Sequence, residues 1–369
     1  MPVLHLMQCT NLGGMEQVSY RLMDTLGETM GLSFRIATPL PFGPGRPRVI
    51  AQDPAAADSP GRGRFGWRDF PAFRRHVHAL AADCSHAWVT GTSASALAAL
   101  LGLNKPKVLS HHYHHFEGSR PWLRWRGFYE LLCRQLDAIT YPTAFTHDEA
   151  LRIAPWLKSR AVVVPNGFEI HCPDEATRLA RRARAREALG LPQDAPVIGN
   201  AGWLIPRKRF DVFLKTAARV HAARPDAVFV ICGGGPLEDD LKRMAAALGI
   251  AGAVRFFGWV QDLNPHYEAW DALLFNSDFD TLPAAPMEAA SRGCVTVASL
   301  LYGGLGEFIE HGQSGYLFDR HDEAALAEAL LRLTSDSAQA EALRAGAIAK
   351  LRRDFSIERA TAFYRDFFG

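Results

Sequence analysis

The sequence lacks a long hydrophobic run. No apolar stretch among its 369 residues approaches the roughly 20 that a membrane-spanning helix requires. Residues 1–7 also lack the basic leader and the apolar region of a secretory signal. We therefore expect a cytoplasmic protein, whose contact with a membrane would be peripheral.

Cysteine and excess charge are scarce as well. The six cysteines lie far apart, with no pair at metal-ligand spacing, which argues against a disulfide scaffold and a zinc site. The 41 basic and 39 acidic residues leave a formal charge of +2, whereas a general nucleic-acid-binding protein needs a clear cationic excess. We expect reduced, mostly buried thiols and no nucleic-acid partner.

What the sequence has is a repeated alternation of short apolar runs with Ala- and Leu-rich segments of helical period. This alternation is typical of βαβ units around parallel sheets, and the chain is longer than one hydrophobic core usually serves. We predict an α/β fold with two doubly wound sheets. The expected strands are residues 3–7, 33–38, 86–90, 107–110, 138–141 and 161–164 in the first half, and 196–201, 227–232, 253–257, 272–276 and 295–298 in the second.

The boundary between the two halves is expected at residues 166–196. Within it, residues 173–189 are rich in Arg, Ala and Glu and predict a surface helix. Residues 40–68 are rich in Pro, Gly, Asp and Arg without periodicity, which predicts a loop. This loop either closes over a ligand or is a tolerated insertion.

Turns that follow the strands are the first places to search for a site, because parallel α/β sheets bind ligands at the carboxyl ends of their strands. Residues 11–16 follow the first expected strand, contain Gly13 and Gly14, and open a helix. They form either a tight turn or a place where the backbone approaches a ligand closely. They do not match the dinucleotide pattern G-x-G-x-x-G.

Four histidines lie between His111 and His115, directly after an expected strand. A metal site is one interpretation, but the regular i, i+4 helical spacing is missing, and solvated loop histidines are common. An imidazole is also suited to hydrogen-bonding a sugar hydroxyl at neutral pH, because its unperturbed pKa is about 6.5. His111 and His112 are therefore candidate ligand contacts.

A basic turn follows the strand expected at residues 196–201. Arg207, Lys208 and Arg209 precede a helix that begins near Phe210, and cations beside a helix N-terminus favour a diphosphate. A solvated basic loop is the alternative. The turns at residues 233–236 and 257–260 follow the next two strands and offer backbone groups to line a nucleotide pocket.

An acidic segment carries the most specific signal. We expect the strand at residues 272–276 to end in an acidic loop, followed by a helix that Pro286 can start and that carries Glu288. The spacing lets Asp280 meet a sugar while Glu288 reaches a ribose. Residues 278–280 also resemble a D-x-D metal clamp, but such short matches are frequent by chance.

Taken in order, these segments resemble the retaining glycosyltransferases of family 4. That family has the GT-B architecture, in which two Rossmann-like domains with parallel sheets face each other across a cleft. The likeness spans nearly the whole chain and includes residues 13–16, 164–167, 202–208, 233–236, 257–258, 280–288 and 303–307. It implies an acceptor-binding domain at 1–168, a nucleotide-sugar-binding domain at 169–355, and a helix at 356–369 that packs back onto the first domain.

The resemblance also implies roles for individual residues. Lys208 would bind the donor diphosphate, Asp280 the transferred sugar, and Glu288 the ribose hydroxyls. The implied catalytic residues are His111, His112, Lys208 and Asp280. The implied donor contacts are Gly14, Arg207, Lys208, Gly234, Val260, Asp280, Thr281, Leu282 and Glu288, and the implied acceptor contacts are Gly13, Glu16, His111 and His112. No cofactor and no metal are implied beside the nucleotide-sugar substrate.

The implied reaction moves a hexose, with retention, from a nucleotide-diphospho-sugar to a saccharide or lipid-linked saccharide in cell-surface polysaccharide or lipopolysaccharide synthesis. Two positions depart from the family. Trp203 stands where Arg is usual, so a phosphate cation is missing unless Arg207 or Arg209 substitutes, and Asp280 is one methylene shorter than the usual Glu. Either change alters donor choice or leaves a non-catalytic nucleotide-sugar binder. A dinucleotide oxidoreductase is a weaker alternative, because neither half shows G-x-G-x-x-G.

Residues 118–129 interleave Arg with aromatic residues. This pattern is suited to an anionic membrane surface, which would fit a lipid-linked acceptor. The alternative is a helix whose arginines are solvated and whose aromatic residues enter the core.

Overall fold

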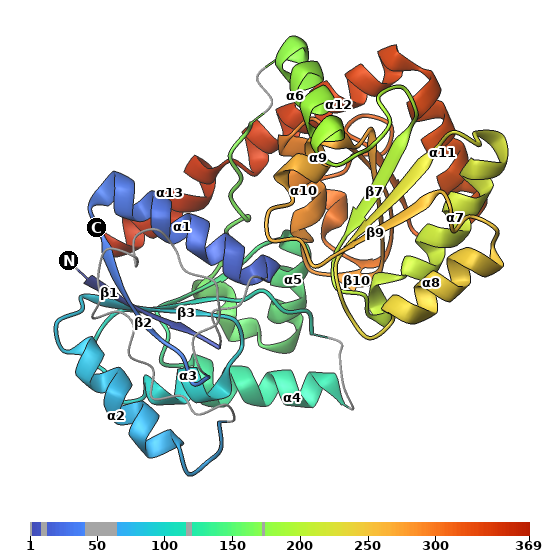
Figure 1. The fold of residues 1–369 in the computed structure, drawn as a ribbon. Helices are drawn as coiled ribbons and strands as arrows, with labels where there is room; N and C mark the ends of the chain where they lie inside the picture. The colour runs from blue at the N-terminus through green and yellow to red at the C-terminus, as the bar shows by residue number, and fades with distance from the viewer. Residues whose placement is uncertain (1, 9–12, 41–64, 116–119, 172–173) are drawn as a thin grey trace. The chain divides into compact units, whose positions relative to one another are not determined.

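The chain divides into two α/β units. The computed structural model describes residues 2–8, 13–40, 65–115, 120–171 and 174–369. One unit comprises Met1–Gly167 with Ile357–Gly369, and the other comprises Phe168–Ser356. Each contains one parallel six-stranded sheet with helices packed on both faces, so the predicted α/β fold with two doubly wound sheets is confirmed (Figure 1). The loop expected at residues 40–68 lies mainly outside the described residues.

The first sheet has the strand order β2-β1-β3-β4-β5-β6. Its strands are β1 (Pro2–Met7), β2 (Ser33–Ala37), β3 (His86–Thr90), β4 (Lys107–Ser110), β5 (Ala138–Tyr141) and β6 (Ala161–Val163). All six were predicted, each within one residue of these bounds. Strands β4 and β5 are buried along their whole length, as strands covered on both faces should be.

The helices of the first unit lie in two layers. They are α1 (Gly14–Met30), α2 (Phe70–Ala81), α3 (Ala94–Ala99), α4 (Pro121–Phe128), a π-helix (Tyr129–Cys133), α5 (Ala144–Ile153), a 3₁₀ turn (Pro155–Ser159) and α13 (Ile357–Phe368). Helices α1 and α13 pack side by side on one face of the sheet, and α2 to α5 cover the other (Figure 1). The hydroxyl of Tyr364 on α13 lies 2.6 Å from that of Ser110 on β4, which ties the chain's last helix to this sheet.

The second sheet has the strand order β12-β11-β10-β7-β8-β9. Its strands are β7 (Val197–Ala201), β8 (Val228–Cys232), β9 (Val254–Gly258), β10 (Ala272–Asp280), β11 (Val295–Gly303) and β12 (Tyr316–Phe318). The prediction was wrong in two respects: β10 and β11 run several residues further than expected, and β12 was missed. The extension follows from pairing, since β10 and β11 stay in register as far as Asp280 and Gly303.

The helices of the second unit also cover both faces of their sheet. They are α6 (Glu175–Ala188), α7 (Phe210–Ala223), α8 (Glu238–Ala247), α9 (Asn264–Ala269), α10 (Ala284–Ser291), α11 (Glu323–Ser335) and α12 (Ser337–Asp354), with 3₁₀ turns at Pro206–Lys208 and Leu305–Glu307. Helices α7, α8 and α11 supply one apolar core, and α9, α10 and most buried residues of α12 supply the other.

Local sequence signals explain several helix ends. Asp174 and Asp336 accept hydrogen bonds from backbone N–H groups in the first turns of α6 and α12. Gly31 ends α1 in the left-handed conformation, with φ of 67°, and its N–H bonds to the Gly27 carbonyl. The chain therefore marks these helix boundaries in its own residues.

A glycine in the second sheet offers a test of its packing. Gly199 lies inside β7, and a Cβ there would stand 2.1 Å from the ring of Trp270, which is buried. We expect Gly199→Ala to lower the melting temperature of this unit by about 2 to 10 °C, because overpacking a core costs about 1–3 kcal/mol. The control is Gly252→Ala, where an added Cβ meets nothing within 4 Å. Equal melting temperatures for the two variants would contradict the packing around Trp270.

Candidate functional site

The turn after β7 brings its cations to the carboxyl edge of the second sheet. Residues 206–208 form a 3₁₀ turn that Pro206 opens, and Arg209 follows in the left-handed conformation with φ of 44°. Helix α7 starts at the next residue. A non-glycine residue in this conformation is uncommon, and such residues cluster at functional sites.

Lys208 and Asp280 form the central contact of this edge. The Lys208 ammonium donates a hydrogen bond of 2.5 Å to Oδ2 of Asp280, and both side chains are largely buried. The guanidinium of Arg207 lies 3.4 Å from the same oxygen and donates to the Phe279 carbonyl at 3.1 Å. The ammonium also stands 5.0 Å from the centre of the Phe275 ring. The structure therefore brings together two of the residues predicted to act on the diphosphate and the sugar.

The acidic segment is part of a strand and not the loop we expected. Asp278 and Asp280 both belong to β10, and side chains two residues apart in a strand point to the same face. Gly303 pairs with Asp280 at the end of β11, and a Cβ at that glycine would stand 1.7 Å from the Asp280 carbonyl oxygen. Only a residue without a side chain allows the two strands to continue to this point.

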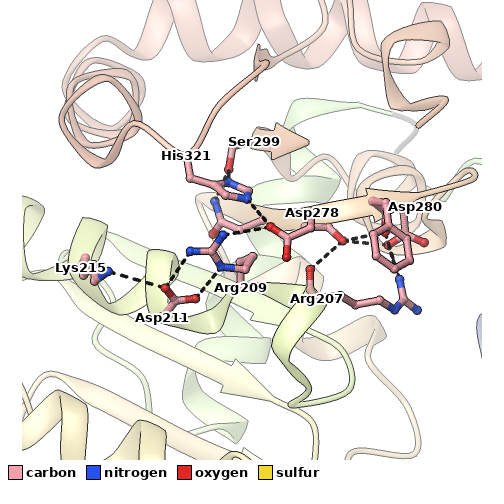
Figure 2. Close-up of polar contacts among 11 residues, drawn as sticks. Arg207, Arg209, Asp211, Lys215, Asp278, Asp280, Ser299 and His321 are labelled. Atoms are coloured by element: carbon pink, nitrogen blue, oxygen red, sulfur yellow. Dashed lines mark hydrogen bonds and ion pairs between the residues drawn. The ribbon is translucent and has the colours of Figure 1, made fainter. Parts of the chain in front are cut away.

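Asp278 anchors a second polar cluster, which Figure 2 shows. Its Oδ1 accepts a hydrogen bond of 2.9 Å from Arg209 and lies 3.0 Å from Nε2 of His321, whose Nδ1 lies 2.7 Å from the Ser299 hydroxyl. Asp211 accepts two further hydrogen bonds from Arg209. The hydrogen bonds that Arg209 donates to Asp211 and Asp278 raise its pKa, against the opposing effect of burial.

The two clusters distinguish the arginines that were predicted to substitute for a missing phosphate cation. Arg209 is held by two carboxylates, Asp211 and Asp278. Arg207 has a single, longer contact with the Asp280 carboxylate and is one third exposed. The geometry therefore favours Arg207 for this role.

Glu288 lies on α10, the helix that follows β10. Its Oε2 accepts a hydrogen bond of 3.2 Å from the Tyr267 hydroxyl, and burial together with this carboxylate raises the pKa of Tyr267. Between strand and helix, the Thr281 carbonyl accepts a hydrogen bond from the Gly304 N–H, and the Leu282 side chain is buried. Because this side chain is buried, a ligand could contact Leu282 only through its backbone.

The predicted histidines occupy different environments at the end of β4. The His111 side chain is fully buried, its Nε2 lies 3.3 Å from the Tyr129 hydroxyl, and its ring stacks on His115 at 4.9 Å. Burial, followed by the neighbouring histidines, holds the pKa of His111 well below its usual value. His112 is only partly buried, and burial lowers its pKa to about 4. Of the two, His112 has the accessible surface that a ligand contact needs.

The remaining predicted residues lie at turns. Gly13 precedes α1, and a Cβ there would stand 2.5 Å from a carboxylate oxygen of Glu16, so this side chain folds back over the turn. Gly14 is the first residue of α1. Gly234 follows β8, and a Cβ there would meet nothing within 4 Å. Val260 is partly buried after β9.

Metal binding by the histidine segment finds no support in the described part of the chain. Among those residues, no group of three or more His, Cys, Asp or Glu side chains is arranged to hold a metal ion. The four described cysteines, Cys84, Cys133, Cys232 and Cys294, are buried free thiols, as predicted.

The described part of the Arg- and aromatic-rich segment, from Arg120 onward, contains α4 and combines features of both interpretations. Trp125 is buried in the core, whereas Trp122 and Leu123 are exposed, as is Leu131 on the following π-helix. The Arg126 guanidinium lies 5.1 Å from the Trp122 ring. A cavity of about 330 Å³ opens beside α4, lined in part by Trp125 and Leu131. No helix in the described residues is long and apolar enough to span a membrane.

Two features of the second unit were missed by sequence reasoning. One is the cluster around Asp278, in which His321 comes from the segment before α11 and carries no motif. The other is a contact between Trp203 and Trp259, whose ring centroids lie 4.8 Å apart. Trp203 was noted only as a departure from a family pattern, since nothing in the sequence pairs it with a residue 56 positions later.

Comparison with solved structures defines the class of fold. The chain superposes with a TM-score of 0.81 on HepE of Anabaena, solved in complex with UDP and glucose, at 18% identity over 99% of this chain and 98% of the other. Two parallel six-stranded sheets, each covered by helices, together with this neighbour, identify the GT-B class of α/β folds.

Family comparisons then place the chain more narrowly. Residues 12–171 match the model for Glycosyltransferase Family 4, and residues 181–350 match that for Glycosyl transferases group 1. The chain belongs to this group 1 and family 4 glycosyltransferase family.

Curated relatives agree with this assignment. A D-inositol 3-phosphate glycosyltransferase of Stackebrandtia nassauensis is 30% identical over 282 residues, which cover 72% of this chain and 62% of the relative. The lipopolysaccharide core biosynthesis glycosyltransferase LpsE of Rhizobium meliloti is 30% identical over 179 residues, or 48% of this chain and 51% of that protein. The matched segments thus span 62% and 51% of the length of these two relatives.

The lowered pKa of His112 predicts an acid-sensitive fold. In the native state the pKa of His112 is about 4, so the ring stays neutral above that pH, whereas in the unfolded chain it takes up a proton near its usual pKa of 6.5. The unfolded state binds more protons between these values, so stability falls as the pH drops from 6.5 towards 4. We expect His112→Gln to reduce this fall, measured as the urea midpoint at pH 7.5, 6 and 5. Parallel losses in the variant and the wild type would contradict a neutral His112.

Proposed function

We propose that this chain is a retaining glycosyltransferase. It moves a hexose from a nucleotide-diphospho-sugar to a saccharide or lipid-linked saccharide acceptor in cell-surface polysaccharide or lipopolysaccharide synthesis. The observation that carries the proposal is the contact of Lys208 with Asp280 at the carboxyl edge of the second sheet. The bond that breaks in such a donor joins sugar to phosphate. Residues that hold those two groups must therefore be neighbours, and these two side chains are.

The cations of the basic turn would act on the leaving group. As the bond from the sugar carbon to the phosphate oxygen breaks, negative charge grows on the departing diphosphate. Lys208, Arg207 and the N-terminus of α7 are placed to stabilise this charge. In retaining transfer by attack on the same face, the acceptor oxygen bonds to the sugar carbon and the departing phosphate oxygen takes the acceptor's proton. Glu288 would hold the ribose.

A metal-independent reaction is supported by the pairing of the two aspartates. Asp278 is paired with Arg209, and Asp280 with Lys208 and Arg207. Carboxylates that already neutralise cations are poor candidates for the D-x-D type of metal clamp. We propose that these cations take the electrostatic part that a metal plays elsewhere.

The donor and acceptor classes draw support from the relatives. HepE was solved with UDP and glucose, which supports a nucleotide-sugar donor, and LpsE acts in lipopolysaccharide core biosynthesis, which supports a saccharide acceptor. His112 follows β4, and Gly13 and Glu16 lie at the start of α1; these three residues are the proposed acceptor contacts.

A non-catalytic nucleotide-sugar binder remains the competing proposal, motivated by Trp203 and Asp280. It is separated from an enzyme by incubating the wild-type chain with UDP-, GDP- and ADP-sugars and measuring the release of nucleoside diphosphate. Release above the uncatalysed rate excludes the binder. Thermal stabilisation against the same panel identifies the donor, because a ligand of the folded state raises the melting temperature.

Lys208→Ala tests the proposed diphosphate contact. We expect it to weaken the binding of the stabilising nucleotide sugar by about 10- to 100-fold, because a hydrogen bond to a charged group contributes about 1.5–3 kcal/mol. Transfer should fall at least as far. The control is Lys242→Ala, a surface lysine of α8 in the same unit that pairs with Glu238. Wild-type binding and turnover in the Lys208 variant would refute the role.

We further propose that α4 docks the first unit on an anionic membrane, at the cytoplasmic face, where a lipid-linked acceptor would lie. The exposed Trp122, Leu123 and Leu131 would enter the interface, while Arg124 and Arg126 would meet the lipid headgroups.

Vesicle sedimentation tests this docking. We expect the wild type to bind vesicles that contain anionic lipid, and Arg124→Glu with Arg126→Glu to abolish most of this binding, since each basic residue near such a surface contributes about 1 kcal/mol. Arg75→Glu on α2 controls for net charge, because Arg75 is exposed in the same unit. If the wild type fails to bind anionic vesicles, the docking proposal is lost while the transferase proposal stands.

A further inference from the structure

Two tryptophans form an exposed aromatic pair at the carboxyl edge of the second sheet. Trp203 follows β7 and Trp259 follows β9, their side chains are 51% and 48% exposed, and their ring planes are inclined at 51°. Burying such rings is strongly favourable, so two that meet and still leave half of their surface in water indicate a role beyond the core.

The strand order explains how the rings reach each other. Strand β8 lies between β7 and β9, and neighbouring strands are spaced about 4.8 Å apart, so the two indoles meet across the end of β8. The residues that follow β8 are Gly233, Gly234 and Gly235. No side chain therefore rises from this turn to separate the rings.

The glycines also leave room beside the pair. A Cβ at Gly202, Gly234 or Gly258, one at the end of each of the three strands, would meet nothing within 4 Å. A flat ligand can thus approach the backbone at three adjacent strand ends.

Backbone hydrogen bonds hold the pair in position. On either side of Trp203, the Gly202 N–H bonds to the Cys232 carbonyl at 2.9 Å and the Leu204 N–H to the Gly234 carbonyl at 3.0 Å. Next to Trp259, the Gly258 carbonyl accepts from the Gly233 N–H at 2.7 Å. The turns that carry both indoles are therefore fixed to the same glycine turn, which favours a preorganised surface.

The pair lies beyond Lys208 along the carboxyl edge of the second sheet. Along the edge, β10 carries Asp280, β7 leads to Lys208, and β8 and β9 follow on the side away from β10. A donor whose diphosphate binds at Lys208 and whose ribose meets Glu288 still has a planar base to place.

We propose that Trp203 and Trp259 form an aromatic platform on which the base of the nucleotide-sugar donor stacks. This inference rests on the proposed function. It gives a physical reason for Trp at position 203, where the family resemblance implies a phosphate-binding Arg: the exchange removes a phosphate contact and adds a base contact. A larger share of the donor's affinity then comes from its base.

Titration of the full chain with UDP, ADP, GDP and inorganic pyrophosphate tests the platform. We expect Trp203→Ala and Trp259→Ala each to weaken nucleoside diphosphate binding by about 5- to 100-fold, the range that aromatic stacking of a base supplies. Pyrophosphate affinity should stay within about twofold of the wild type, since pyrophosphate has no base to stack. Trp203→Phe and Trp259→Phe should retain most of the affinity. Trp67→Ala, an exposed tryptophan of the first unit that lies outside the proposed sites, is the matched control.

The outcomes distinguish a failure of the aromatic platform from a failure of the proposed donor site. If the alanine variants bind nucleoside diphosphates like the wild type while Lys208→Ala does not, the platform is refuted and the donor site stands. Equal losses for pyrophosphate and nucleotides also refute stacking, because the tryptophans would then act on the phosphate site or the fold. If the wild type binds none of these nucleotides or their sugars, the proposed function itself fails.

Discussion

The ion pair of Lys208 and Asp280 is the interaction on which the carboxyl edge of the second sheet depends. It joins the turn after β7 to the end of β10, two strands that are neighbours in the sheet. Both side chains are largely buried, so either charge alone would carry a substantial desolvation cost. The pair thus fixes where the basic turn lies, and the pairing of Asp280 with Gly303 fixes where the acid lies.

The three cations of the basic turn pair with different carboxylates and therefore have different structural roles. Arg209, in its left-handed conformation, is held by Asp211 and Asp278 and serves to shape the start of α7. Lys208 and Arg207 share the single oxygen Oδ2 of Asp280. In the proposed function, the donor's diphosphate would compete with this carboxylate for Lys208, and a sugar hydroxyl that bonds to Asp280 would free the ammonium. The proposal therefore couples donor binding to rearrangement of the ion pair.

The sequence predicts those parts of the fold and site that depend on residues close together in the chain, and fails for those that depend on residues far apart in it. Short apolar runs predicted eleven of the twelve strands, because the residues of a buried strand are themselves apolar. Strand β12 was missed because its three residues are too few to form a recognisable pattern. A family resemblance implied that Lys208 and Asp280 bind neighbouring parts of one donor, but their direct ion pair was not predicted. The continuation of β10 through two aspartates was not predictable locally, since pairing with β11 overrides the low strand preference of Asp. His321 and the contact of Trp203 with Trp259 depend on strand order, which no local pattern contains.

The two departures from the family pattern act at adjoining strand ends and have a joint electrostatic consequence. With Trp at position 203, the cations of this edge are Arg207, Lys208 and Arg209, and each of them is already paired with a carboxylate. A diphosphate meets little free positive charge there, so long-range attraction contributes less to its binding than at a site with an additional arginine. Affinity must then come from contacts that are neutral and short-ranged. In our proposal, the exposed aromatic pair beside three glycine-ended strands provides such contacts. Trp203 and the shorter acid at position 280 would then act together: charge-based attraction of the diphosphate decreases, and stacking of the base increases.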